Sequence, residues 1–249
     1  MEELRRGGRE RWEIRAEMVR QLAIVGYGKM GKLIEQLAPE YGFEVRARSN
    51  SRANANGSAL TKEALTGVDV ALEFTTPEAA PENLLRLAET GIPAVTGTTG
   101  WMARLPEVRA AVERNGSGLV WGPNFSVGLN LFRQVVAEAS RLFAAQQEYG
   151  AWGWEIHHAA KKDAPSGTLL ALAEEMKRNG YTRAVSLSAN RAGTAPGAHE
   201  IGFDSAADTI TIRHTARSRE GFARGALRAA RWVVGKRGVF EFREILGEL

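Results

Sequence analysis

The chain of 249 residues has no cysteine and no long hydrophobic run. Without cysteine it can form no disulfide, no thiolate metal site and no cysteine nucleophile. No apolar run approaches the roughly eighteen residues that a membrane-spanning helix needs, so we expect no association with a membrane. Residues 1–18 carry charges of both signs and lack the apolar centre of a secretory signal. We therefore expect a charged tail there and a cytoplasmic location.

Dense basic segments are also missing, although the formal net charge is +4. Proteins that bind nucleic acid usually gather their lysines and arginines on one face or in one block. Here the arginines are spread along the chain, and no dense basic block is interleaved with aromatic residues. A small anionic ligand accounts for the surplus equally well. We expect no nucleic-acid partner.

A glycine-rich segment lies between a predicted strand and a predicted helix. The apolar run from Leu22 to Val25 is too short for a helix and fits a buried strand. Glycines follow in G-x-G-x-x-G spacing, which allows a tight turn, approach of a pyrophosphate and close helix packing. A helix amino terminus adds free N–H groups, although a glycine turn without a ligand is the alternative. The predicted cofactor contacts are Gly26, Tyr27, Gly28, Lys29, Met30 and Gly31.

The second predicted strand, Phe43 to Ser49, does not end in the acidic residue that often binds the ribose of NAD. Guanidinium and hydroxyl donors without a repelling carboxylate suit a 2′-phosphate. We therefore predict NADPH as the preferred cofactor, with NADH possible. A solvated loop with exposed arginines is the alternative. The predicted contacts are Arg48, Ser49, Asn50, Ser51 and Arg52.

Strands and helices continue to alternate up to about residue 127, which predicts an α/β fold with a Rossmann-like, doubly wound parallel sheet. Further strands are expected within 69–77, 92–100 and 118–128. Loops at the carboxyl ends of such strands line the ligand crevice. The residues that this argument assigns to the cofactor are Phe74, Thr75, Thr76, Gly97, Thr98, Thr99, Gly122, Pro123, Asn124 and Phe125.

After Gly128 the pattern changes to strands with few helices between them, which predicts an α+β domain on a mixed open sheet. We expect residues 19–127 and about 220–249 to form the dinucleotide-binding domain. Residues 128–219 are expected to bind substrate and to form a homo-oligomer. The apolar residues assigned to one face of the second sheet are Trp152, Trp154, Ile156, Ile201, Phe203, Ile210 and Ile212.

The segment EIHHAAKKDAPSGT, residues 155–168, ends one predicted strand and begins a helix. Neighbouring strand residues point to opposite faces, so we expect only one of His157 and His158 to share a cluster with Lys161. A lysine and a histidine there could supply a proton. No carboxylate or third histidine has a suitable ligand spacing, so no metal is expected. Structural or surface histidines remain the alternative from this segment alone.

The start of that helix offers a second type of site. Asp163 is expected to cap the helix, and Pro165 suits its first turn. The N–H groups of Gly167 and Thr168 then suit a substrate carboxylate.

Several segments together resemble the 4-hydroxy-tetrahydrodipicolinate reductase (dihydrodipicolinate reductase) family of lysine and diaminopimelate biosynthesis. They are GYGKMG, GTTG, GPNFSVG, EIHHAAKKDAPSGT, RAGTAPGAHEIGF and HTARSREGFARGALRAARW. The resemblance implies NAD(P)H-dependent reduction of 4-hydroxy-2,3,4,5-tetrahydrodipicolinate to tetrahydrodipicolinate with loss of water. It also implies a homotetramer built by the sheets of the second domains.

The resemblance further implies roles for individual residues. His157 is implied as proton donor or acceptor, Lys161 as proton donor and His158 as a substrate contact. The implied carboxylate site is Gly167 and Thr168, and Arg219 is implied near the cofactor. The sequence departs from many members at Asn50, where an acidic residue is common, and this favours NADPH.

Two alternatives stay open at this point. One is another two-domain NAD(P)-dependent dehydrogenase that acts on an amino acid or a sugar acid. The other is a nucleotide-sensing regulator without enzymatic activity, although the sequence shows no convincing DNA-reading module.

Overall fold

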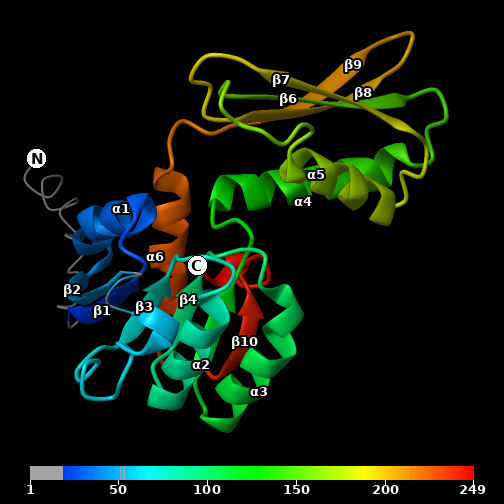
Figure 1. Ribbon diagram of the computed structural model, residues 1–249. Coiled ribbons are helices and arrows are strands. Elements are labelled where there is room, and N and C mark those ends of the chain that lie inside the picture. The colour runs from blue at the N-terminus through cyan, green and yellow to red at the C-terminus, as the bar shows by residue number, and fades with distance from the viewer. Residues whose placement is uncertain (1–18, 51, 53) are drawn as a thin grey trace, which may run out of the picture.

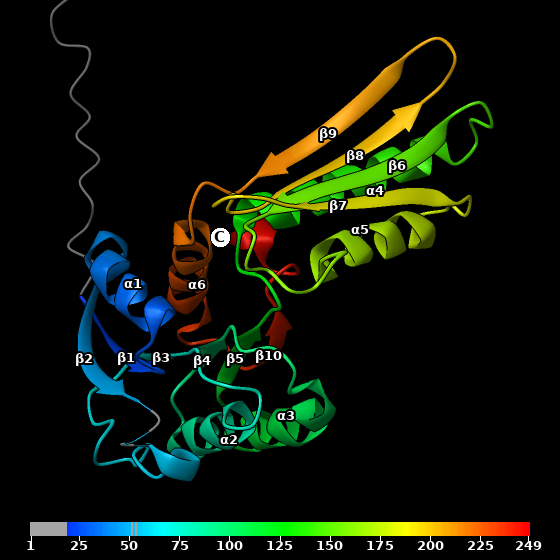
Figure 2. The same ribbon diagram turned by 45° about the horizontal axis from the view of Figure 1, so that its top comes forward.

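The computed structural model describes residues 19–50, 52 and 54–249, which form two sheets, each with its own helices (Figures 1 and 2). The tail predicted for residues 1–18 and the contact predicted for Ser51 lie outside the described residues. No helix in these ranges is long and apolar enough to cross a membrane.

The first sheet is six-stranded, in the order β10-β5-β4-β3-β1-β2, and its neighbouring strands are parallel. The strands are β1 Arg20–Val25, β2 Phe43–Ser49, β3 Val70–Glu73, β4 Ala94–Thr96, β5 Gly118–Trp121 and β10 Gly238–Glu241. The doubly wound parallel sheet predicted from the sequence is confirmed. Strand β10 was not predicted, because its four residues are too few to show a period.

Helices cover both faces of this sheet (Figure 2). The helices α1 Lys29–Leu37 and α6 Glu220–Val233 pack on one face, and α2 Ala80–Thr90 and α3 Leu105–Arg114 pack on the other. Short 3₁₀ turns are Ala38–Tyr41, Ala55–Gly57, Met102–Arg104 and Leu246–Glu248. Because strand side chains alternate, Leu22 and Ile24 enter one core while Ala23 and Val25 enter the other.

The second sheet is four-stranded, in the order β7-β6-β8-β9. Its strands are β6 Gly150–His157, β7 Val185–Arg191, β8 Ala198–Asp204 and β9 Thr209–Thr215. The pair β6–β7 is parallel and the other two pairs are antiparallel, which confirms the predicted mixed sheet. The helices α4 Val127–Phe143 and α5 Gly167–Arg178 lie on one face, and no described helix covers the other (Figures 1 and 2).

The register of the second sheet shows that the predicted apolar face is wrong. Trp152 pairs with Gly202, whereas Ile201 pairs with Gly153. Directly opposed residues share a face, so Trp152, Trp154 and Ile156 lie on the face without helices. The other residues of the predicted face lie on the side of α4 and α5: Ile201, Phe203, Ile210 and Ile212. The sequence shows alternation within a strand but not the offset between strands.

The chain crosses between the two sheets twice, and the crossings lie side by side. The first leads from β5 into α4, which Ser126 caps by accepting from the N–H of Leu129 at 3.2 Å. The second leads from β9 into α6. A Cβ built on Gly221 would lie 3.7 Å from Oγ of Ser126, and one built on Gly128 would lie 3.4 Å from Nε2 of His214.

Helix α6 lies so close to the first crossing that one position accepts only glycine. A Cβ built on Gly225 would lie 1.8 Å from the carbonyl oxygen of Phe125. We predict that Gly225→Ala lowers the free energy of unfolding by about 1–3 kcal/mol, because backbone must move. The higher helix propensity of alanine, about 1 kcal/mol, only partly offsets this. Urea denaturation measures the change.

The matched control is Gly247→Ala, since nothing lies within 4 Å of a Cβ built there. A Gly225→Ala protein as stable as the control would contradict this packing of α6.

Candidate active site

The glycine loop after β1 has the geometry that a pyrophosphate requires. Gly26 has φ of +98°, and a Cβ on it would lie 2.1 Å from the carbonyl oxygen of Phe74. A Cβ on Gly31 would lie 2.4 Å from the oxygen of Gly26, whereas nothing lies within 4 Å of one on Gly28. The first and third glycines therefore serve the turn and the packing, and the second leaves open space. Helix α1 begins there without a side-chain cap, so its first N–H groups suit an anion.

Two threonine-containing loops follow β3 and β4, and a buried glutamate joins them. Glu73 has no exposed surface and accepts hydrogen bonds from the N–H of Thr75 at 3.1 Å and from Oγ1 of Thr96 at 2.5 Å. The Thr75 N–H also donates to Oγ1 of Thr98 at 2.9 Å. Burial raises the pKa of Glu73, and these hydrogen bonds oppose the change. The sequence showed no such role for Glu73.

Side chains of the loop after β5 make contacts within the protein. Phe125 is buried and packs on Phe242, with ring centroids 4.6 Å apart. Asn124 accepts from the N–H of Ser126 at 2.8 Å through its side chain. Of the predicted cofactor contacts in this loop, Gly122 to Phe125, only Pro123 is exposed. The side chain of Phe125 belongs to the core.

The end of β2 lies beside the glycine loop, because the N–H of Gly26 donates to the oxygen of Ser49 at 2.9 Å. Nε of Arg48 donates to Oε1 of Glu35, a residue of α1, at 2.6 Å. The sequence predicts no carboxylate beside these cations, and the structure corrects this. Asn50 accepts from the N–H of Arg52 at 3.0 Å.

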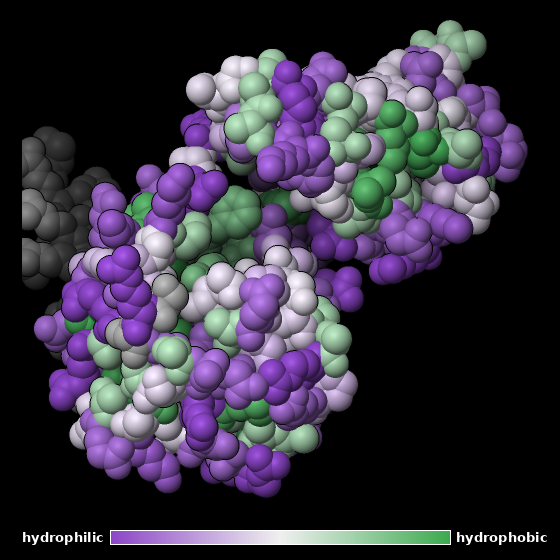
Figure 3. All heavy atoms as spheres, viewed as in Figure 1, coloured by the Kyte–Doolittle hydropathy of each residue, from purple (hydrophilic) through white to green (hydrophobic). Residues whose placement is uncertain are grey.

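A cleft of about 440 Å³ lies between the two sheets and collects predicted residues from three elements. Met30 comes from α1, His158 directly follows β6, and Arg219 directly precedes α6. Pro196, Ala216, Ser218 and Phe222 complete the lining. The space-filling view shows a hollow with hydrophobic residues between the two bodies (Figure 3). Met30, His158 and Arg219, which lie far apart in the sequence, therefore face one cavity.

His157 points away from this cleft into a buried ionic cluster centred on Glu155. The Glu155 carboxylate accepts from the N–H of Ser166 at 2.8 Å and from Nη2 of Arg191 at 2.7 Å. Its Oε2 lies 3.7 Å from Nδ1 of His157 and 3.4 Å from Nε2 of His199. Burial would raise the pKa of Glu155, but the hydrogen bonds from Ser166 and Arg191 hold it below its ordinary value.

Strand pairing explains why the sequence did not show this cluster. Glu155 lies opposite His199 on β8, and His157 lies opposite Arg191 on β7. Burial lowers the pKa of His157, the negative charge of Glu155 opposes this change, and the positive charge of Lys161 adds to it. Because these partners come from different strands, no local spacing indicates them.

The atoms of this cluster also lie close enough for a cation. Ligand atoms of Glu155, His157 and His199 all lie within 4.8 Å of one another. However, Arg191 already neutralises the carboxylate, and Ser166 donates to both of its oxygens. We therefore interpret it as a hydrogen-bonded ionic cluster.

The start of α5 differs from the prediction in its capping residue. Ser166 is the N-cap, and its hydroxyl accepts from the N–H of Leu169 at 3.2 Å. Asp163, predicted as the cap, lies before the helix and accepts from Nζ of Lys161 at 2.6 Å. Pro165 also precedes the N-cap. The helix predicted to begin in this segment is confirmed, and Gly167 at its first position is exposed.

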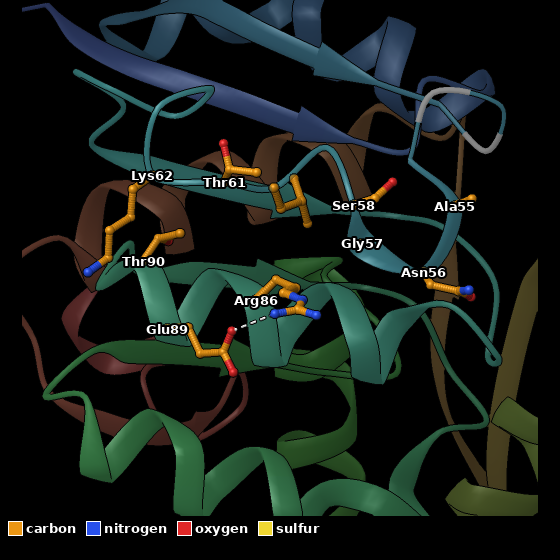
Figure 4. A pocket seen from close by; sticks show the side chains of 10 residues that line it. Ala55, Asn56, Gly57, Ser58, Thr61, Lys62, Arg86, Glu89 and Thr90 are labelled. Carbon is orange, nitrogen blue, oxygen red and sulfur yellow. Dashed lines mark hydrogen bonds and ion pairs between the residues drawn. The ribbon is translucent and has the colours of Figure 1, made fainter.

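A larger cavity, of about 600 Å³, lies between the loop after β2 and α2 (Figure 4). Arg86, Glu89 and Thr90 line it from the carboxyl half of α2, and Lys62 lines it from the loop. That half of α2 runs toward the amino-terminal edge of the parallel sheet. Because ligands of such sheets bind at the carboxyl edge, we assign the active site to the smaller cleft.

The ionic cluster predicts a dependence of stability on pH. Burial, together with His157, lowers the pKa of His199 from 6.5 to about 4. The unfolded chain therefore binds a proton here that the folded protein does not bind, and the free energy of unfolding falls as the pH falls from 6.5 to 4. One such group contributes a slope of about 1.4 kcal/mol per pH unit. We expect His199→Gln to flatten this slope.

Urea denaturation of both proteins at pH 7, 6 and 5 measures the slope. Equal slopes would show that His199 titrates normally in the folded state.

Family models and curated proteins both match this chain. A family model described as "Dihydrodipicolinate reductase, N-terminus" matches residues 20–125, and one described as "Dihydrodipicolinate reductase, C-terminus" matches residues 128–246. The 4-hydroxy-tetrahydrodipicolinate reductase of Christiangramia forsetii is 31% identical over 239 residues, which cover 92% of this chain and 98% of that protein. The enzyme of the same name from Chromobacterium violaceum is 37% identical over 270 residues, with coverage of 92% and 99%.

Among solved structures, the dipicolinate-bound dihydrodipicolinate reductase from Paenisporosarcina sp. TG-14 has the same fold. Its TM-score is 0.77 at 22% identity, and the match covers 93% of this chain and 100% of that one. The two family models and the curated relatives show that the chain belongs to the 4-hydroxy-tetrahydrodipicolinate reductase (dihydrodipicolinate reductase) family.

Proposed function

We propose that the cleft between the two sheets is where the chain carries out the reaction of its family, with NADPH as the preferred cofactor. The reaction is the NAD(P)H-dependent reduction of 4-hydroxy-tetrahydrodipicolinate in lysine and diaminopimelate biosynthesis. The observation that carries the proposal is the cleft itself, since Met30, His158 and Arg219 line it together. It lies between the glycine loop and the end of β6, so a cofactor and a substrate can meet there.

The cofactor would be held along the carboxyl edge of the first sheet. The open space at Gly28 and the N–H groups that begin α1 suit its phosphates. The Glu73 network holds the loops after β3 and β4, which places Thr75 and Thr98 at the same edge. When bound, the reduced nicotinamide supplies a hydride, and the residues of the chain position it and exclude water.

The substrate is a small dicarboxylate, and the start of α5 suits one of its carboxylates. Gly167 and Thr168 present N–H groups at the amino end of the helix, where the helix dipole favours an anion. Lys161 lies close by and pairs with Asp163. A substrate carboxylate would compete with Asp163 for this ammonium group. The Paenisporosarcina structure, which holds dipicolinate, supports a ligand of this class.

We assign the proton to Lys161 rather than to His157. Burial lowers the pKa of His157, so its ring is neutral at neutral pH and is a much weaker acid than an imidazolium. The side chain of Lys161 is 24% exposed and points toward Asp163 on the loop that precedes α5. Its ammonium group both attracts a dianion and can donate a proton. His158, which lines the cleft, contacts the substrate.

The open face of the second sheet supports a homo-oligomer, and we propose a tetramer in the cytoplasm. Trp152 and Trp154 lie half-buried on this face, which no described helix covers. Partner subunits that pack there would bury them. We further propose residues 19–127 with 220–249, and residues 128–219, as the two domains.

The first test concerns the proton donor. Lys161→Ala should lower kcat by about 10²- to 10⁴-fold, the usual contribution of general acid catalysis. The affinity for NADPH, measured by fluorescence titration, should stay the same because Lys161 lies outside the glycine loop. The neighbouring Lys162 is exposed and makes a matched control. Near-normal turnover of Lys161→Ala would remove Lys161 from this role.

The second test concerns the cofactor. A coupled assay condenses pyruvate with aspartate semialdehyde through the preceding synthase and follows the absorbance of NADPH or NADH. We expect oxidation of both, with a higher kcat/KM for NADPH. Equal values would keep the reaction and discard the preference. No oxidation of either by a folded protein would contradict the assigned substrate.

A further inference from the structure

The carboxylate of Glu35 reaches a place where the sequence predicts only cations and hydroxyl groups. Glu35 lies in the last turn of α1, and its Oε1 accepts from both Nε and Nη2 of Arg48. Its Oε2 accepts from the hydroxyl of Tyr27, which stands between the first two glycines of the loop. The three side chains therefore join the glycine loop, α1 and the end of β2.

This trio lies at the edge where the adenosine ribose of a dinucleotide is held. Val25, at the end of β1, lies opposite Ser49 at the end of β2, and the N–H of Gly26 donates to Ser49. In dinucleotide-binding folds, the residues at the end of the second strand distinguish a ribose hydroxyl from a 2′-phosphate. Arg48 precedes Ser49, so its guanidinium is the strand-end cation at this position.

The charge of Glu35 opposes that of Arg48 at short range. Arg48 and Tyr27 donate to the carboxylate and lower the pKa of Glu35, so it is ionised at neutral pH. The side chains of Arg48 and Glu35 are 45% and 27% exposed, so water screens the pair but does not remove the interaction. An ionised carboxylate cancels part of the attraction of Arg48 for a phosphate and itself repels that phosphate.

We propose that Glu35 is a specificity-determining residue that limits the preference for NADPH over NADH. By holding Arg48, Glu35 weakens binding of the 2′-phosphate of NADPH. Binding of NADH is unaffected, because its ribose carries no 2′-phosphate. The inference rests on the proposed function, because it takes Arg48 to face the ribose of the cofactor. The proposal also explains why β2 ends without an acidic residue: the carboxylate at this place comes from Glu35 of α1.

The test compares cofactor binding by the full-length wild type, Glu35→Gln and Glu138→Gln. Glutamine keeps the size of Glu35 and removes its charge. Glu138 is an exposed glutamate that pairs with an arginine on α4, away from the glycine loop, so it is the matched control. Calorimetry at one ionic strength gives Kd for NADPH, NADH, adenosine 2′,5′-bisphosphate and 5′-AMP.

We expect Glu35→Gln to tighten NADPH and the bisphosphate about fivefold, the factor that corresponds to one charge pair a few ångströms apart in water. Binding of NADH and 5′-AMP should change less than twofold, and Glu138→Gln should behave as the wild type. In Arg48→Ala, the added substitution Glu35→Gln should have a smaller effect on NADPH, because the cation it releases is gone.

Two results would overturn the inference. An unchanged ratio of the Kd values for NADH and NADPH in Glu35→Gln would show that its charge has no part in selection. Equal weakening of all four ligands would show that Glu35 only supports the glycine loop through Tyr27. A wild type that binds both cofactors equally would contradict the proposed preference for NADPH, yet the change in ratio between the two proteins would still decide the role of Glu35.

Discussion

The interaction on which the second half of the protein depends is the buried ion pair between Glu155 and Arg191. A carboxylate without exposed surface is tolerated only when charge and hydrogen bonds compensate it. Here Arg191 supplies the charge, and Ser166 donates from its backbone and its hydroxyl. Arg191 also donates to the backbone oxygen of Asp163. The same pair therefore fixes the end of β6, the N-cap residue of α5 and the loop between them that carries Lys161.

A second buried glutamate, Glu73, holds loops of the first sheet, and it differs from Glu155 in its partners. Glu73 has hydroxyl and amide partners but no described cation within ion-pair distance, so burial raises its pKa. Glu155 has Arg191, so its pKa is lowered in spite of burial. Both lie at or near the carboxyl end of a strand and hold the loops that follow. The loops that follow these strands are thus positioned by buried side chains, and neither glutamate lines the cleft.

Much of this could be predicted from local sequence. The glycine spacing, the alternation of strands and helices and the helix that follows residues 155–166 each express contacts between near neighbours, and all are present in the fold. The cluster around Glu155 and the pairing of Arg48 with Glu35 could not be predicted, because strand register and helix orientation bring these residues together. The register between strands is also the reason why the prediction assigned Ile201 and Phe203 to the wrong face of the second sheet. Membership of the family decides against the two alternative functions that the sequence left open, another dehydrogenase and a regulator.

The two adjacent crossings between the sheets have a mechanical consequence. A single flexible connection would let the two halves rotate relative to each other in any direction. Two connections side by side restrict this to rotation about one axis. Torsion across the line through Ser126 and Gly221 would separate α6 from the backbone of Phe125, against which it packs closely, so we expect relative motion of the halves to be a rotation about that line. The cleft lined by His158 and Arg219 lies beside this axis. A rotation of this kind would change the width of the cleft.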